Sequence, residues 1–276
     1  MSTPPANAQW YALNRPPPDA LTVAGHAYRI VRVFKHDFYA ATCLYEAAGP
    51  APFGRIVVKF YRTQVFFGLP MRWAGRLMRN RERAIYSALA GLLGVPRWIG
   101  QVGPTALAVE YIPGTTLEDL DTPPQPGFFE KLRTLFDRIH ARGVGYCDAN
   151  KLSNIIVAPD GQPFLVDFQI SIRRRPRWPA PLRRIVSACV DYVQQCDVYH
   201  LYKHKRRLSP GELTDEEDRL SRRRGRLHTL HRKLTDPWRA FRRRFLRRRR
   251  ARGLLVSPTE AIEKARPPER RTRTGA

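Results

Sequence analysis

The chain has 276 residues, 43% of them hydrophobic, which suits one two-lobed domain or two small ones and excludes a largely disordered chain. Lysine and arginine total 49 against 24 acidic residues, and the net charge of +25 favours anionic partners such as phosphates, acidic lipid surfaces or nucleic acid. The four cysteines form no C-x-x-C pair, which indicates a reducing compartment. Without a signal-peptide pattern or an apolar run of about 18 residues, a cytoplasmic location is expected.

The N-terminal part of the chain predicts an arm followed by antiparallel strands. Residues 1–22 are rich in proline and are expected to form an extended arm. Alternating apolar residues predict strands over 28–34 and 38–45, and an apolar run predicts a third over 54–61. The connection Lys35-His36-Asp37 between the first two strands contains no glycine, so phosphate contacts there would have to come from Lys35 or from backbone amides.

Lys59 interrupts the apolar run of the third strand. With a side-chain period of two, it shares a face with Val57 and Tyr61. A lysine on a half-buried face needs an anionic partner. The alternative is an edge-strand lysine in solvent.

A helix is predicted over 71–93, because apolar residues recur there at helical spacing. Glu82 is the only acidic residue of this helix and is the local candidate to pair with Lys59. The alternative is an intrahelical ion pair, for example with Arg79 three residues earlier. The sequence Gly94-Val95-Pro96 is expected to end the helix.

Two further strands are predicted over 98–102 and 107–111, which gives five strands in all. A Pro-Gly pair follows, and beyond it a helix is predicted over 128–142 from its apolar periodicity. His140 in that helix has two interpretations, a catalytic acid–base or a packed, hydrogen-bonded helix residue, and the second is favoured.

The stretch 143–171 carries the strongest pattern in the sequence. Ile155–Val157 and Phe164–Val166 are short apolar runs separated by the turn signal Pro159-Asp160-Gly161, which predicts a β-hairpin. Asp148 and Asn154 then precede the first strand, and Asp167 follows the second. Because the two outer strand ends of a hairpin meet at its open side, these polar side chains are expected to converge.

Two carboxylates, an amide and a lysine at one point suit phosphoryl transfer. Asn154 and Asp167 offer the hard oxygen ligands that Mg²⁺ prefers. Asp148 is not needed as a metal ligand and is suited to orient or deprotonate a hydroxyl. Lys151 is suited to neutralise charge on a transferred phosphate. The alternative is a polar surface hairpin, because Asp and Asn are common in loops.

On these residues the chain resembles the protein kinase-like superfamily, and its small bacterial branches of the lipopolysaccharide (Kdo/heptose) kinase and RIO-like type in particular. Asp148 and Asn154 look like the aspartate and asparagine of the kinase catalytic loop, and Asp167-Phe168-Gln169 looks like its Asp-Phe-Gly. The matching elements also occur in the same order along the chain.

The resemblance implies an α+β, two-lobed fold, with a five-stranded antiparallel N-lobe carrying one helix over 23–112 and a mainly helical C-lobe over 113–252. It implies ATP and Mg²⁺ as cofactors. Lys59 would then clamp the α- and β-phosphates and Glu82 would position Lys59, while backbone groups near Glu110 and Ile112 would bind adenine as a hinge. An ordinary interdomain linker has a similar composition to this hinge segment.

The sequence departs from the kinase pattern at several points. The interval from Asp148 to Asn154 is one residue longer than usual, Tyr146-Cys147 replaces His-Arg, and Gln169 replaces glycine. The glycine-rich phosphate loop and the Ala-Pro-Glu segment are missing, which favours a small or lipid-linked hydroxyl acceptor such as an envelope sugar. A protein Ser/Thr acceptor stays open, and the alternative from another class is a catalytically inactive pseudokinase acting as a membrane-associated scaffold.

The last third of the sequence is dense in arginine. Apolar residues from Leu220 to Phe245 form one stripe of a predicted basic amphipathic helix, with Arg242–Arg244 and Arg247–Arg250 on its polar face. Such a helix suits attachment to an anionic membrane on its inner face, or packing through its stripe with a solvated face, while nucleic acid is the least favoured partner. Residues 253–276 are expected to be a disordered tail.

Overall fold

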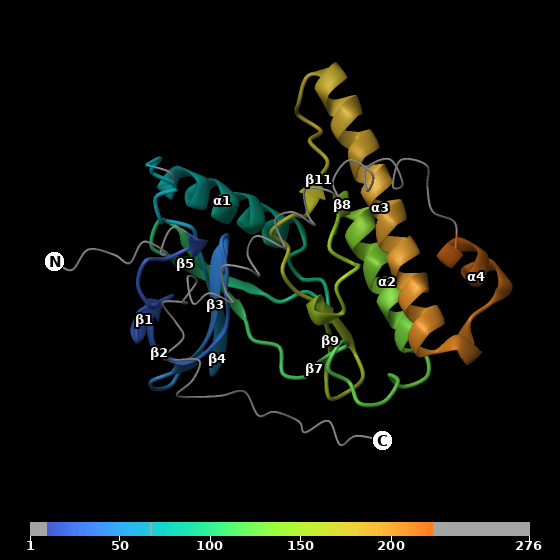
Figure 1. The fold of residues 1–276 in the computed structure, drawn as a ribbon, viewed down its shortest axis with the longest axis horizontal. Helices are drawn as coiled ribbons and strands as arrows, with labels where there is room; N and C mark the ends of the chain where they lie inside the picture. The colour runs from blue at the N-terminus through green and yellow to red at the C-terminus, as the bar shows by residue number, and fades with distance from the viewer. Residues whose placement is uncertain (1–9, 67, 223–276) are drawn as a thin grey trace, which may run out of the picture. The chain divides into compact units, whose positions relative to one another are not determined.

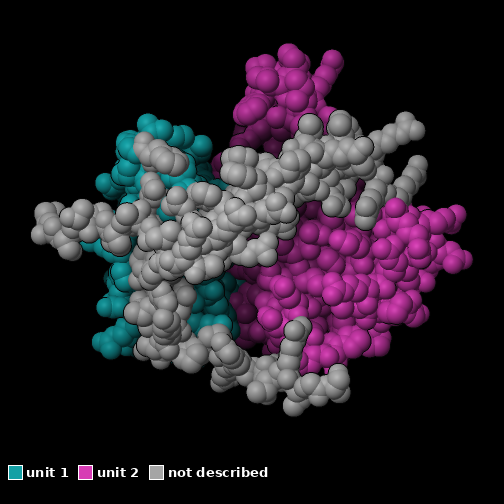
Figure 2. Space-filling model, viewed as in Figure 1, with its two compact units in different colours: residues 1–79, 99–111, 237–276 teal, residues 80–98, 112–236 magenta. Residues whose placement is uncertain are grey.

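In the computed structural model, residues 10–66 and 68–222 are described, and they belong to two units (Figure 2). Unit 1 contains residues up to 79 together with 99–111, and unit 2 contains 80–98 and 112–222. The described residues form an antiparallel sheet of six strands and four α-helices, with two small additional sheets. The α+β class predicted from the sequence is therefore confirmed.

Unit 1 is built on one sheet with the strand order β1-β2-β3-β4-β6-β5 (Figure 1). Its strands are β1 (Ala20–Val23), β2 (His26–His36), β3 (Ala40–Ala47), β4 (Arg55–Tyr61), β5 (Trp98–Val102) and β6 (Ala106–Glu110). Strand side chains alternate between the two faces, and those on one face form a buried core: Val23, Tyr28, Val33, Ala41, Cys43, Tyr45, Ile56, Val58, Ala106 and Ala108.

The sheet has six strands where the sequence predicted five, and the extra strand is β1. It pairs with the start of β2, with Ala20 opposite Arg29 and Val23 opposite His26. The two residues between them, Ala24 and Gly25, both have positive φ angles of 48° and 84°, as a tight hairpin turn of this kind requires. Alanine is unusual at the first position of such a turn, where Asn, Asp or Gly is more common. Without that sequence signal, and directly after a proline-rich segment, the hairpin was not predicted.

The end of the predicted proline-rich arm packs against unit 1. Residues 11–19 form neither helix nor strand, yet Tyr11 and Ala12 are buried. The N–H of Ala12 donates to the carbonyl oxygen of Asp37 at 2.8 Å, and the N–H of Leu13 donates to Nε2 of His36 at 3.2 Å. These bonds attach the segment to the β2–β3 connection.

Unit 2 is mainly helical, as predicted for this part of the chain. The helix α1 (Arg72–Ala88) has residues in both units, and α2 (Phe128–Ala141), α3 (Ala180–Leu208) and α4 (Asp215–Arg222) belong to unit 2. Helices α2 and α3 pack side by side (Figure 1). Two small sheets complete the unit: β7 (Thr115–Thr116), β9 (Ile155–Val157) and β10 (Pro163–Leu165) form one, and β8 (Val144–Gly145) and β11 (Ile172–Arg173) form the other.

The helix over 71–93 is confirmed but is shorter than predicted, because it ends at Ala88. Gly91 and Gly94 follow with φ angles of 80° and 92°, a conformation that glycine adopts without strain. The carbonyl of Gly94 accepts the N–H of Leu165 at 2.8 Å, so this glycine lies directly behind the strand that leads to Asp167.

The predicted basic amphipathic helix and the tail over 253–276 lie outside the described residues, apart from Leu220 in α4. In the described part of the chain, every helix is too short or too polar to cross a membrane.

Candidate functional site

The predicted hairpin is present and arranges the candidate residues at its open end. Strands β9 and β10 pair in antiparallel register, with Ile155 opposite Leu165. One position further out, the N–H of Val166 donates to the carbonyl of Asn154 at 3.0 Å. Asn154 and Asp167 are therefore neighbours at the mouth of the hairpin, as the sequence predicts.

Two consecutive tight turns place Lys151 and Asn154 beside Asp148. The N–H of Lys151 donates to the carbonyl of Asp148 at 3.1 Å, and the N–H of Asn154 donates to that of Lys151 at 3.2 Å. The extended backbone of Lys151, with φ −92° and ψ 113°, joins the two turns. The interval of six residues between Asp148 and Asn154 is thus spanned by two successive turns, so the longer loop still brings these side chains together.

The side chains of this loop converge on one oxygen of a nearly buried carboxylate. Asp148 is 8% exposed, and its Oδ2 accepts hydrogen bonds from Nζ of Lys151 at 2.6 Å and from Nδ2 of Asn154 at 2.9 Å. Within the described residues Oδ1 of Asp148 accepts no hydrogen bond. One oxygen is therefore held in place by two hydrogen bonds, and the other makes none with the described residues.

The orientation of the Asn154 amide follows from this contact. A carboxylate oxygen only accepts, so the NH₂ group of Asn154 must face Asp148 and its carbonyl oxygen must face away. That oxygen and the Asp167 carboxylate are donors of the kind that Mg²⁺ takes. Mg²⁺ usually takes one or two protein carboxylates and completes its coordination with water and phosphate oxygens, so one amide oxygen and one carboxylate fit this ion.

The backbone at the site adopts a conformation that is unusual for residues other than glycine. Cys147, which precedes Asp148, has a φ of 72°. Asp167, itself a candidate metal ligand, has a φ of 63°. Left-handed backbone at such residues costs about 1–3 kcal/mol and occurs mostly where function requires it. Ala24, in the β1–β2 turn, is the only other described residue besides glycine with a positive φ.

A buried aromatic cluster supports Asp167. Phe168 is fully buried, and its ring centroid lies 5.3 Å from that of Tyr86 and 5.1 Å from that of Tyr146. The hydroxyl of Tyr146 donates to the carbonyl of Val166, and Oγ of Ser171 donates to the carbonyl of Tyr146 at 2.8 Å. The segment around Asp167 is therefore fixed on both sides.

Glu82 lies close to the same aromatic cluster. Burial raises the pKa of Tyr86 well above its usual range, and the negative charges of Glu82 and Asp167 raise it further. Glu82 itself is only 1% exposed. The two pairings considered for Glu82, with Lys59 and with Arg79, both stay predictions.

Asp197 of α3 holds the candidate catalytic loop, and the sequence analysis missed it. Its Oδ2 accepts the N–H of Tyr146 at 2.8 Å, and its Oδ1 accepts the N–H of Cys147 at 3.1 Å. Nε2 of His140 lies 3.2 Å from Oδ2 of Asp197. Burial raises the pKa of Asp197, and the hydrogen bonds from His140 and the two N–H groups oppose that shift.

His140 is thus a packed helix residue, as favoured by the sequence. Its ring lies 5.8 Å from that of Phe136 and contacts the buried Asp197 rather than a candidate substrate group. The thiol of Cys147 is equally unsuited to chemistry, since burial and the charges of Asp197 and Asp148 raise its pKa to about 12. A thiol with that pKa stays protonated at neutral pH and is a poor nucleophile.

The candidate nucleotide residues of unit 1 occupy the sheet. Lys59 is 7% exposed in β4, between β3 and β6, with Thr42 and Leu107 as its register partners. The alternative of an edge-strand lysine in solvent is therefore wrong. Glu110 ends β6, and Ile112 is buried at the start of the next stretch of unit 2. Because Lys59 and Glu82 belong to different units, their pairing stays a prediction.

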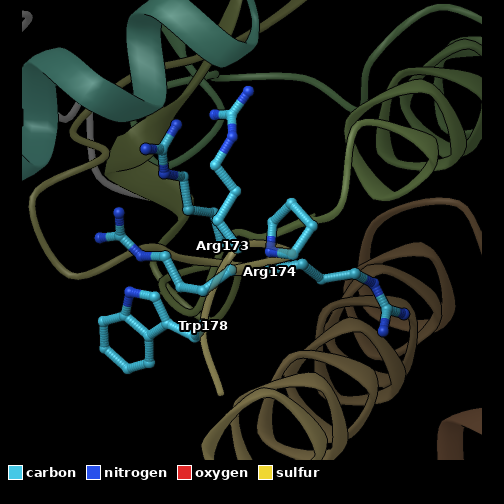
Figure 3. Close-up of a pocket in the computed structure, with 6 residues that line it drawn as sticks. Arg173, Arg174 and Trp178 are labelled. Atoms are coloured by element: carbon cyan, nitrogen blue, oxygen red, sulfur yellow. The ribbon is translucent and has the colours of Figure 1, made fainter. Parts of the chain in front are cut away.

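A basic hollow of about 290 Å³ lies on the segment that follows Asp167, lined by Arg173, Arg174, Arg175, Pro176, Arg177 and Trp178 (Figure 3). Two of its guanidinium groups are engaged within unit 2. Arg173 donates to the carbonyl of Ala84 at 3.3 Å, and Arg174 forms an ion pair with Asp191. These contacts fasten the segment to α1 and α3.

Comparison with known proteins finds no family model that matches this chain and no similar curated protein.

Proposed function

We propose that this protein is an ATP- and Mg²⁺-dependent phosphotransferase with a kinase-like, two-lobed fold, which transfers the γ-phosphoryl group to a hydroxyl acceptor. The observation that carries the proposal is the state of Asp148. One of its oxygens is held by Lys151 and Asn154, the other accepts no hydrogen bond within the described residues, and Asp167 is at the mouth of the same hairpin. A carboxylate arranged in this way suits a base that acts on a hydroxyl.

In the proposed reaction, Asp148 accepts the proton of the acceptor hydroxyl as its oxygen forms a bond to phosphorus, and the bond from phosphorus to the leaving nucleoside diphosphate breaks. General-base catalysis of this kind supplies roughly 10²–10⁴-fold in rate. Lys151, 51% exposed at its side chain, is placed to neutralise negative charge on the transferred group.

Asn154 and Asp167 would hold Mg²⁺, which when bound supplies positive charge that neutralises phosphate oxygens. For unit 1, the proposal keeps the roles of Lys59 on nucleotide phosphates and of backbone near Glu110 on adenine. The burial of Lys59 supports its role, because a buried ammonium group needs an anionic partner.

The test is transfer of labelled γ-phosphate from Mg·ATP into cell-envelope extract, followed by separation of glycolipid, protein and soluble fractions. The variant Asp148→Asn removes the base while keeping its shape. Asp160→Asn is the matched control, because Asp160 lies in the exposed turn of the same hairpin and accepts only the N–H of Gln162. We expect label with the wild type and the control but not with Asp148→Asn.

The fraction that receives label identifies the acceptor as a glycolipid, a protein or a small molecule. Equal label with Asp148→Asn and the wild type would contradict the role of Asp148. The absence of transfer by the wild type into any fraction would instead favour the inactive scaffold.

A further inference from the structure

A groove of about 680 Å³ opens in unit 2 beside the loop that carries Asp148. It lies between that loop and the last turns of α3, with residues 150–153 on one side and 203–207 on the other. Lys151, whose Nζ is 2.6 Å from Oδ2 of Asp148, is part of its lining. A residue of the groove lining therefore contacts the carboxylate that we propose as the base.

The charge of the groove is strongly positive. Four cationic side chains line it, Lys151, Lys203, Arg206 and Arg207, against one carboxylate, that of Glu118. The size is typical of a small-ligand site, since such pockets usually have volumes of about 300–1,000 Å³.

Two of these cations, Lys203 and Arg207, have no acidic partner among the described residues. Nζ of Lys203 donates to Oδ1 of Asn150, a neutral group, at 3.1 Å. Arg206 donates to Oγ of Ser221 at 2.7 Å, and its charge contributes to lowering the pKa of Asp218. Arg207 is exposed and makes no hydrogen bond or ion pair within the described residues. The positive charges of Lys203 and Arg207 are therefore not neutralised by the described residues that surround the groove.

Lys205, in the same turn of α3, shows the opposite arrangement. It is almost completely buried and pairs with Glu130 at 2.5 Å and with Glu217 at 2.9 Å. Glu130 and Glu217 thus neutralise Lys205, and neither of them lines the groove.

His204 fixes the groove side of α3 to the loop. It is buried, and its Nε2 lies 2.9 Å from the carbonyl oxygen of Ala149, the residue after Asp148, so the ring donates its hydrogen there. Burial lowers the pKa of His204 to about 4, which keeps it neutral beside Lys203 and Arg207. The cations are therefore carried on a helix that is bonded directly to the loop.

We propose that this groove binds a phosphate group carried by the acceptor, next to the hydroxyl that Asp148 activates. The proposal rests on the proposed function and narrows its acceptor to phosphorylated compounds. A phosphate suits the lining better than a carboxylate, because its three terminal oxygens are able to take hydrogen bonds from several cationic groups at once. A free sugar phosphate and a phosphorylated headgroup at a membrane share this chemistry.

The test measures binding in the absence of ATP and Mg²⁺, so that it does not depend on catalysis. One arm titrates full-length protein with glucose 6-phosphate and with glucuronate, which carries a carboxylate on the corresponding carbon, by calorimetry. The other arm measures binding to phosphatidylcholine vesicles with and without phosphatidic acid. The C-terminal arginines are the same in every variant, so differences between variants report on the groove.

The variant Lys203→Gln with Arg207→Gln removes two charges from the groove. The matched control Arg183→Gln with Arg184→Gln removes two charges from the other end of α3. We expect the groove variant to weaken phosphate binding at least tenfold in one arm, and the control variant to weaken it less than twofold. If the soluble arm responds, glucuronate should bind at least tenfold more weakly than glucose 6-phosphate. Arg207→Gln alone, at an exposed site that leaves folding intact, is expected to weaken binding about threefold.

A response in the soluble arm identifies a free phosphorylated acceptor, and a response confined to the vesicles identifies a headgroup. Equal loss in the groove variant and the control would overturn the proposal, as would undiminished phosphate binding by the groove variant or binding in neither arm. If the groove variant binds phosphate normally while Asp148→Asn loses transfer, the proposed function stands without this acceptor site.

Discussion

Asp197 accepts the backbone N–H of Tyr146 at 2.8 Å, although the two residues are 51 positions apart in the chain. With its second oxygen on the N–H of Cys147, this one carboxylate fixes the two residues that immediately precede Asp148. The candidate base is therefore positioned by a helix as well as by its own loop.

The variant Asp197→Asn is expected to lower both stability and turnover. An amide has only one acceptor oxygen, so at least one of the two buried N–H groups loses its partner, at a cost of about 1–3 kcal/mol. Urea unfolding measures the stability change, and transfer rates under conditions where the variant is folded measure the misplacement of Asp148.

Asp191→Asn is the control for that experiment, since Asp191 is a partly exposed carboxylate of the same helix that pairs with Arg174. A surface ion pair contributes about 0–1 kcal/mol, so the control should remain close to the wild type. An Asp197→Asn protein as stable and active as the control would show that the bonds to the loop are dispensable.

Asp167→Ala is expected to lower Mg·ATP-dependent turnover by roughly 100-fold or more, because the loss of a metal ligand removes several kcal/mol of charge stabilisation. Asp160→Ala, in the turn of the same hairpin, should retain wild-type turnover. Titration of Mn²⁺ in the presence of ADP gives a second measurement, in which Asp167→Ala should bind the metal more weakly. Full turnover in Asp167→Ala would refute the metal assignment.

Acidification is expected to destabilise the protein through its buried histidines. Burial lowers the pKa of His204 and of His36 to about 4 from an ordinary value of 6.5, so between these pH values the unfolded chain binds more protons than the folded one. Stability therefore falls as the pH drops from 6.5 to 4, by about 3 kcal/mol for each histidine.

Urea unfolding across pH 4.5–8 measures this loss. His204→Gln retains a donor for the carbonyl of Ala149 and carries no titrating group, so its unfolding free energy should fall less on acidification and match the wild type at pH 8. For His36, protonation removes the acceptor of the Leu13 N–H, and the release of residues 11–13 should be visible as faster proteolysis there at low pH. An unchanged pH dependence in His204→Gln would contradict the neutral state of that ring.

Alanine substitutions at two glycines distinguish the stability cost of backbone strain from that of steric crowding next to the hairpin. Both Gly91 and Gly94 have positive φ angles, but a Cβ at Gly91 meets open space whereas at Gly94 it would lie 2.7 Å from the side chain of Leu135 and 2.9 Å from the carbonyl oxygen of Pro163. Gly91→Ala should cost about 1 kcal/mol and Gly94→Ala about 1–3 kcal/mol more. Equal unfolding free energies would show that the surroundings of Gly94 yield without cost.

The sequence predicted the parts of the candidate site that local spacing determines. The hairpin follows from two apolar runs and a turn signal, and its geometry brings Asn154 next to Asp167. The triplet spacing of Asp148, Lys151 and Asn154 is a local property as well, although its meaning as two successive turns became clear only from the backbone hydrogen bonds.

The contributions of α3 were not predictable in the same way. Several buried positions of this helix carry polar residues, including Asp197, His204 and Lys205, so the apolar periodicity that reveals other helices is weak there. Tyr146, Ala149 and Glu130, which these three side chains contact, lie more than 50 residues away in the chain, and no local pattern points to them. The basic groove depends on the same long-range packing.

Because α3 is one continuous helix, it fixes the distance between Asp197, which binds the loop, and the cations of the proposed acceptor site. Asp197 and His204 are seven residues apart, close to two full turns, and so both face the loop. A single residue inserted between them would rotate the C-terminal part of α3 by about 100° relative to Asp197. The cations of the groove would then no longer face the loop. A whole-turn insertion would keep the facing but move His204 about 5.4 Å along the axis, so the interval of seven residues is fixed by the two contacts that Asp197 and His204 make with the loop.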